Sequence, residues 1–176
     1  IISSIEFQLE ENVPISVNEA LFDYTVIKES LKGNNMEVGV SVLPKKVVAS
    51  YTSLLNDVGL IPMSFEIEAE SISKAIVPKG DMNTYMIVDY GRTRTSFSIV
   101  SGGVIQYTST AEIGGELVLD IIKKQTGASD DVAQKIKNEK GLVKDPENPG
   151  LYMSLSNIVS VLKDEINKRY IFWHTH

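Results

Sequence analysis

The chain has 176 residues, of which 43% are hydrophobic and 23% charged, and its mean hydropathy of -0.01 is that of an ordinary folded protein. A formal net charge of -6 at pH 7 leaves no excess of positive charge to neutralise phosphates, which argues against a nucleic-acid partner. The chain has no cysteine for disulfide or thiolate chemistry and no apolar run of the roughly 18 residues that a membrane span requires, so we expect a cytoplasmic protein without direct membrane insertion.

Residues 1–62 are expected to form a small sheet that carries one helix. Apolar and polar residues alternate over residues 5–9, which predicts a half-buried strand at the start of the chain. Two further strands are expected over residues 22–27 and 38–42, because both are rich in β-branched and aromatic residues. The Lys-Gly-Asn-Asn sequence at residues 32–35 is strong turn chemistry and would join them as a hairpin.

Two helices are expected on either side of a proline-containing segment. Apolar residues at helical spacing predict a helix over residues 47–58, with Gly59 as its C-terminal stop. The same spacing predicts a shorter helix over residues 69–76 that ends before Pro78. Residues 63–83 are therefore expected to connect two larger parts of the chain.

Residues 84–127 are expected to contain three strands in meander order and one helix. Short apolar or alternating runs predict strands over residues 84–90, 95–100 and 104–111, and glycines lie between the second and the third. A helix is expected from about residue 113, and Gly127 would end it.

Residues 128–176 are expected to form a helical subdomain. A Ser-Asp-Asp sequence predicts the start of a helix over residues 129–140, and proline, glycine and asparagine predict a loop over residues 144–150. Apolar residues then recur every three or four positions over residues 151–173, which predicts a long amphipathic final helix.

The turn between the first two strands of the meander carries the most informative residues. Asp89 and Gly91 begin a hydroxyl-rich turn that continues through Thr93 and Thr95. Backbone N–H groups and hydroxyls on such a turn can hold an anion, and Asp89 could hold a hydrated Mg²⁺ beside it. The alternative is a β-hairpin in which the same residues only make the bend.

Five motifs in this order resemble the PilM family of type IV pilus assembly proteins, in the PilM/FtsA branch of the actin-like ATPase superfamily. They are LLNDVGLIP at residues 54–62, EIEA at 66–69, VDYGRTRT at 88–95, EIGGE at 112–116 and VAQKIK at 132–137. The resemblance covers only the middle of the family's length, and the chain begins without Met, so we expect an internal fragment of a longer protein.

The resemblance implies a mixed α+β and α/β fold. Residues 1–62 would be an SHS2-like interaction subdomain of the 1C type, and residues 63–83 a connecting helix. Residues 84–127 would be part of an actin-like, ribonuclease H-like subdomain that contains the second phosphate hairpin. Residues 128–176 would complete the helical part.

The resemblance also implies a nucleotide site, formed by Asp89, Gly91, Thr93, Thr95, Gly114, Gly115, Gln134 and Lys137. Asp89 would lie near Mg²⁺ through water, and Lys137 would reach the adenosine. The family usually has Glu where this chain has Gln134, which could still bind ribose hydroxyls as a neutral partner. Without the family, Gly114 and Gly115 could instead allow a strand to pack closely on a helix, and Lys137 could be a solvated lysine.

The first phosphate hairpin and the later Gly-Gly adenine motif of actin-like proteins are missing from this chain. The resemblance implies ATP and Mg²⁺ in the full-length protein, in a family that hydrolyses ATP weakly at most. Because those two elements would enclose the nucleotide from either side, this fragment is expected to be inactive and to hold no cofactor. No catalytic residue is assigned.

The resemblance implies a cytoplasmic scaffold or adaptor for assembly of a type IV pilus, or a related secretion system, at the inner membrane. It would recruit the N-terminal peptide of a PilN-type membrane protein and could also self-associate. An extended peptide would bind beside a strand edge or an apolar groove, for which Tyr24, Val26 and Tyr51 are candidates. The alternatives are an FtsA-like cell-division adaptor, an ATPase of the actin or Hsp70 fold or a sugar kinase, and an α+β domain without a ligand.

Overall fold

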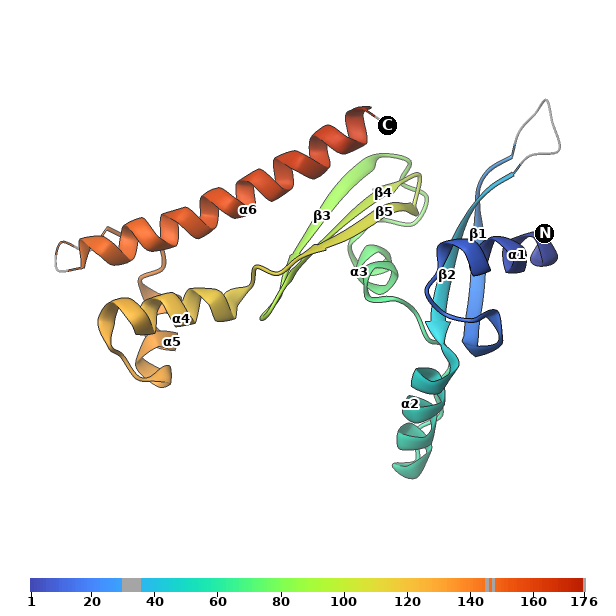
Figure 1. Cartoon of the computed structure of the whole chain (residues 1–176), viewed down its shortest axis with the longest axis horizontal. Helices are drawn as coiled ribbons and strands as arrows, with labels where there is room; N and C mark the ends of the chain where they lie inside the picture. Colours follow the sequence, from blue (N-terminus) through green and yellow to red (C-terminus); the bar gives the residue numbers. More distant parts are fainter. Residues whose placement is uncertain (30–35, 145, 147, 176) are drawn as a thin grey trace. The chain divides into compact units, whose positions relative to one another are not determined.

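The computed structural model describes residues 1–29, 36–144, 146 and 148–175 (Figure 1). The described residues within Ile1–Thr84 and Val100–Gln106 form one compact unit, and those within Tyr85–Ile99 and Tyr107–His176 form a second. The four finer segments expected from the sequence, with boundaries after residues 62, 83 and 127, stay a prediction. The mixed α/β class is confirmed, because helices and two small β-sheets alternate along the chain.

The first unit begins with helix α1 (Ile2–Asn12), so the strand expected over residues 5–9 is wrong. Ile5 and Leu9, each 5% exposed, lie one helical turn apart and share the buried face. Phe7 belongs to the apolar alternation but is 68% exposed. The alternating pattern therefore also contains a spacing of four residues, from Ile5 to Leu9, and this spacing fits a helix equally well.

The predicted hairpin is confirmed. After the short 3₁₀ helix η1 (Val17–Glu19), strand β1 (Ala20–Glu29) pairs antiparallel with strand β2 (Met36–Pro44). Leu21 lies opposite Leu43 and Asp23 opposite Ser41, so these four side chains share one face of the hairpin. The turn predicted at residues 32–35 lies outside the described residues.

Helices α2 (Lys45–Asp57) and α3 (Glu68–Ile76) confirm the two helices expected around the proline-containing segment. Gly59, with a φ of 77°, lies just beyond the end of α2, where a side chain would be strained.

The three-stranded meander is also confirmed. Strands β3 (Thr84–Tyr90), β4 (Thr95–Ser101) and β5 (Val104–Ala111) neighbour one another in chain order. The central strand β4 is the most buried, since Phe97, Ile99 and Val100 are at most 1% exposed. The alternation of β4 is therefore kept in the sequence although both faces are buried, since Ser98 is only 5% exposed.

Three helices follow the sheet, α4 (Gly115–Thr126), α5 (Asp130–Glu139) and α6 (Pro149–Thr175), in agreement with the sequence. They share an apolar core of Ile122, Ala133, Leu151, Leu155 and Ile158. Full burial of one such aliphatic side chain stabilises the fold by about 1.5–3 kcal/mol. None of the helices in the described part of the chain, α6 included, combines the length and apolarity that a bilayer crossing requires.

A buried arginine fixes the second half of α6 to the sheet. Arg169 is 7% exposed, and its Nε donates a hydrogen bond of 2.9 Å to the Ser109 hydroxyl on β5. Its guanidinium pairs with Glu165 and lies 4.4 Å from the ring centre of Phe97 on β4. Buried cations require such partners, so this contact holds α6 in one register on the sheet.

Candidate functional site

The turn between β3 and β4 is a tight reversal, as predicted. The N–H of Gly91 donates to the carbonyl oxygen of Arg94 at 2.9 Å, which closes the hairpin. Thr93 is exposed at the tip of the turn. Thr95 is fully buried, and its hydroxyl donates to the carbonyl oxygen of Ile113 at 2.5 Å. Thr93 therefore faces solvent, whereas Thr95 fixes the start of β4 to the segment before α4.

Asp89 lies near the end of β3 and is half-buried. Among the described residues, no group of three His, Cys, Asp or Glu side chains could hold a metal ion. Mg²⁺ usually keeps several waters and binds through one or two carboxylates together with phosphates, and a lone Asp89 suits that mode of binding.

The hairpin backbone lies directly against the start of α4. The N–H groups of Gly115 and Glu116 donate to the carbonyl oxygens of Gly91 and Arg92, at 3.0 and 2.7 Å. A Cβ atom on Gly114 would lie only 2.5 Å from the Arg92 oxygen. This close approach explains Gly114 without a ligand, which is the packing alternative considered from the sequence.

Lys137 on α5 reaches the same junction. Its Nζ donates to the carbonyl oxygen of Gly115 at 3.2 Å. The structure thus brings Gly91, Gly114, Gly115 and Lys137 together. Gln134 is exposed, and its amide donates to the Oδ1 of Asn138 on its own helix. Whether any of these residues binds a nucleotide stays a prediction.

An apolar cavity of about 250 Å³ lies next to this junction in the second unit. It is lined by Tyr90 and Lys137 and otherwise mainly by apolar side chains from α4, α6 and the segment after α5. Burial raises the pKa of the Tyr90 phenol, because a charged phenolate would lose hydration there. The cavity therefore combines apolar walls with an ammonium and a hydroxyl.

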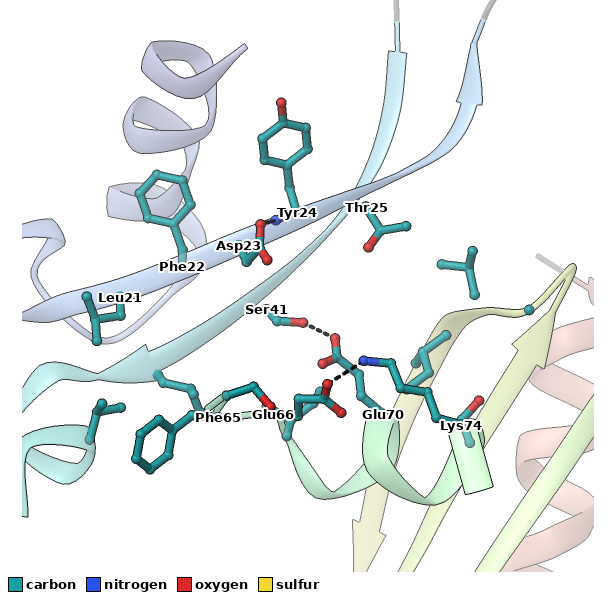
Figure 2. Close-up of a pocket in the computed structure, with 18 residues that line it drawn as sticks. Leu21, Phe22, Asp23, Tyr24, Thr25, Ser41, Phe65, Glu66, Glu70 and Lys74 are labelled. Atoms are coloured by element: carbon teal, nitrogen blue, oxygen red, sulfur yellow. Dashed lines mark hydrogen bonds and ion pairs between the residues drawn. The ribbon is translucent and has the colours of Figure 1, made fainter. Parts of the chain in front are cut away.

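A larger groove, of about 380 Å³, lies in the first unit between the β1–β2 hairpin, α3 and the start of β5 (Figure 2). Leu21 and Leu43, on one face of the hairpin, form apolar walls together with Phe65. Figure 2 shows the Phe22 and Tyr24 rings on the opposite side of β1, so these two residues border the groove mainly through their backbone.

Polar groups line the middle of the groove (Figure 2). Glu70 accepts a hydrogen bond from the Ser41 hydroxyl, and Lys74 Nζ lies 2.6 Å from Glu66 Oε1. The hydrogen bond to Glu66 raises the pKa of Lys74. Asp23, on the same face of the hairpin as Ser41, uses its Oδ1 to accept the N–H of Tyr24 at 2.8 Å.

Sequence reasoning found little of this groove. Of the three candidates, Tyr24 borders the groove, whereas Val26 and Tyr51 are not among its lining residues. The acidic residues were missed because charges on a short helix are usually solvated. The spacing of Glu70 and Lys74 was the available signal, since it places these two side chains on one side of α3, whereas Glu66 lies before the helix.

The family model described as type IV pilus assembly protein PilM matches residues 2–167. None of the curated proteins matched the chain. The solved "PilM-PilN type IV pilus biogenesis complex" is 16% identical, with a TM-score of 0.77 over 99% of this chain and 51% of that chain.

Two further solved structures are similar over a smaller part of the chain. MreB5 of Spiroplasma citri bound to ADP is 15% identical, with a TM-score of 0.56 over 72% of this chain and 47% of that chain. The ethanolamine utilization protein EutJ from Carboxydothermus hydrogenoformans is 18% identical, with a TM-score of 0.51 over 67% of this chain and 42% of that chain. At these identities the likeness establishes an actin-like fold, and the chain spans about half the length of these structures.

Proposed function

The chain belongs to the type IV pilus assembly protein PilM family, and we propose that it is the part of an actin-like scaffold that recruits a PilN-type membrane protein. The family match over residues 2–167 carries this proposal, and it favours pilus assembly over an FtsA-like role in cell division or a sugar kinase. The similar solved complex contains a PilN partner, which supports a partner of the same type here. In this proposal the protein is cytoplasmic and reaches the inner membrane only through that partner.

We propose that the N-terminal peptide of the partner binds in the groove between the hairpin and α3. Phe65, Leu21 and Leu43 offer apolar surface for alternate side chains of an extended peptide. Five consecutive residues of β1, Leu21 to Thr25, border the groove, so strand backbone is exposed to it as well as side chains. Main-chain hydrogen bonds would then add to the apolar contacts.

We also propose that the whole protein binds ATP with Mg²⁺, and that this chain supplies one side of that site. The exposed tip of the β3–β4 turn at Thr93 supports an anion site there, and Asp89 lies before the turn. The apolar cavity beside Lys137 has walls that suit a flat base. Because this chain supplies only one side, we expect it to bind ATP weakly and not to hydrolyse it.

Fluorescence anisotropy with a labelled N-terminal peptide of the PilN-type protein from the same organism tests the partner proposal. Phe65→Ala removes an apolar wall of the groove and is expected to weaken binding at least about tenfold. Tyr51→Ala, an exposed position on α2 outside the groove, should leave binding unchanged. Binding that is absent, or equally strong in both variants, would contradict the proposal, provided that circular dichroism shows both variants folded.

A further inference from the structure

The groove between the hairpin and α3 is acidic. Among its lining residues, Asp23, Glu66 and Glu70 carry carboxylates, and Lys74 carries the opposing ammonium. Lys74 is already paired with Glu66 at 2.6 Å. The charge that remains is therefore that of Asp23 and Glu70.

These two carboxylates are held by neutral donors. Glu70 accepts a hydrogen bond from the Ser41 hydroxyl, and Asp23 accepts one from the backbone N–H of Tyr24. In the part of the chain that the structure describes, neither has a Lys or Arg within ion-pair distance. Asp23 is exposed and Glu70 is half-buried, so a cation that enters the groove from solvent can reach both carboxylates.

The two carboxylates border the same part of the groove although they come from different elements. Asp23 on β1 is the cross-strand partner of Ser41 on β2, and such partners have Cβ atoms about 5 Å apart on one face. Ser41 in turn donates to Glu70 on α3. Ser41 therefore lies opposite Asp23 in the hairpin and donates to Glu70, and Figure 2 draws this second contact as a dashed line.

We propose that this groove selects a partner peptide with a Lys or Arg side chain between apolar ones, and that the cation binds between Asp23 and Glu70. The inference rests on the proposed function and adds the chemistry of the partner segment. Apolar side chains of the peptide contact Leu21, Leu43 and Phe65, while the cation forms charge-assisted hydrogen bonds. An acidic peptide is repelled, because Lys74 is occupied by Glu66.

Two substitutions isolate the charge. Glu70→Gln retains an oxygen that accepts from Ser41, and Asp23→Asn retains one that accepts from the Tyr24 N–H. Each variant therefore removes a negative charge and keeps the local hydrogen bond. Glu68→Gln is the matched control, because Glu68 is exposed on the same helix and does not line the groove.

The test is anisotropy with the N-terminal peptide of the PilN-type protein, at low and at physiological salt, and with the same peptide after Lys and Arg are replaced by Gln. We expect Glu70→Gln and Asp23→Asn each to weaken binding about fivefold to thirtyfold, and most at low salt. Glu68→Gln should bind as the unchanged protein does, and the neutral peptide should bind all four proteins equally weakly.

The outcomes separate this inference from the proposed function. If the peptide binds and Phe65→Ala weakens binding, but both charge variants stay within about twofold, the charge selection is overturned and the partner proposal stands. If the neutral peptide binds as tightly as the original one, the charge selection is also overturned. If the peptide does not bind the unchanged protein, both proposals fail together.

Discussion

Gly114→Ala tests how closely the β3–β4 turn lies against α4. The added Cβ would lie 2.5 Å from the Arg92 oxygen and 2.7 Å from the Arg94 nitrogen. Both are backbone atoms, so no side chain can rotate to relieve the clash. Gly114 has a φ of -152° and a ψ of -177°, an extended conformation that alanine adopts without strain. The predicted cost therefore comes from the clash alone.

The magnitude follows from two contributions. Overpacking in a close-packed region costs about 1–3 kcal/mol. Movement of the turn would also break the hydrogen bonds from Gly115 N–H to Gly91 and from Glu116 N–H to Arg92, each worth about 0.5–1.5 kcal/mol. We expect Gly114→Ala to lower the free energy of unfolding by about 2–6 kcal/mol, the sum of these contributions.

Urea unfolding followed by circular dichroism measures this loss, and two other glycines serve as controls. In Gly115→Ala the new Cβ would meet only the flexible end of Lys137 at 2.6 Å, so we expect a loss below about 1.5 kcal/mol. In Gly150→Ala the nearest atom is Gln125 Oε1 at 3.4 Å, and helix α6 should gain up to about 1 kcal/mol. The reasoning is refuted if Gly114→Ala is as stable as the unchanged chain, or if Gly115→Ala costs as much.

The buried arginine, the two turn threonines and the shifted phenol give three further predictions. Arg169→Ala should cost about 3 kcal/mol in urea unfolding because it leaves a carboxylate without its cation, whereas the exposed neighbour Lys168→Ala should stay within about 0.5 kcal/mol. Thr95→Val should cost about 1–2 kcal/mol by removing its hydrogen bond, and Thr93→Val almost nothing; equal costs would contradict the assigned burial. Since burial raises the folded-state pKa of Tyr90, stability should fall as pH rises above 10.0, and Tyr90→Phe should reduce that fall in thermal melts.

Most of the elements could be predicted from the sequence because their signals are local. Strand formers on both sides of a turn predicted the β1–β2 hairpin, and glycine marked the ends of α2 and α4 correctly. The exception is α1, where Ile5 and Leu9 fit both a strand and a helix. Periodicity alone cannot distinguish a strand from a helix in so short a segment. The structure shows a helix, in which both residues are buried on one face.

The candidate site could be predicted only in part, because some of its features depend on contacts between segments that are distant in the sequence. The turn at Gly91 was found because glycine and hydroxyl residues mark turns locally. That Thr95 faces inward and that Lys137 contacts Gly115 depend on tertiary contacts between distant segments. The acidic groove was missed for the same reason, since Asp23 and Glu70 come from different elements and line one groove only after folding.

The hydrogen bonds of Gly115 and Glu116 also bear on where a phosphate would bind. Their N–H groups already donate to carbonyl oxygens of the turn, so an anion there would displace two hydrogen bonds worth about 0.5–1.5 kcal/mol each. The exposed tip at Thr93 requires no such exchange. If the proposed nucleotide site is correct, a phosphate is therefore expected at the tip of the turn. The absence of a side chain at Gly114 lets the turn lie against α4, and this contact fixes the orientation of the tip.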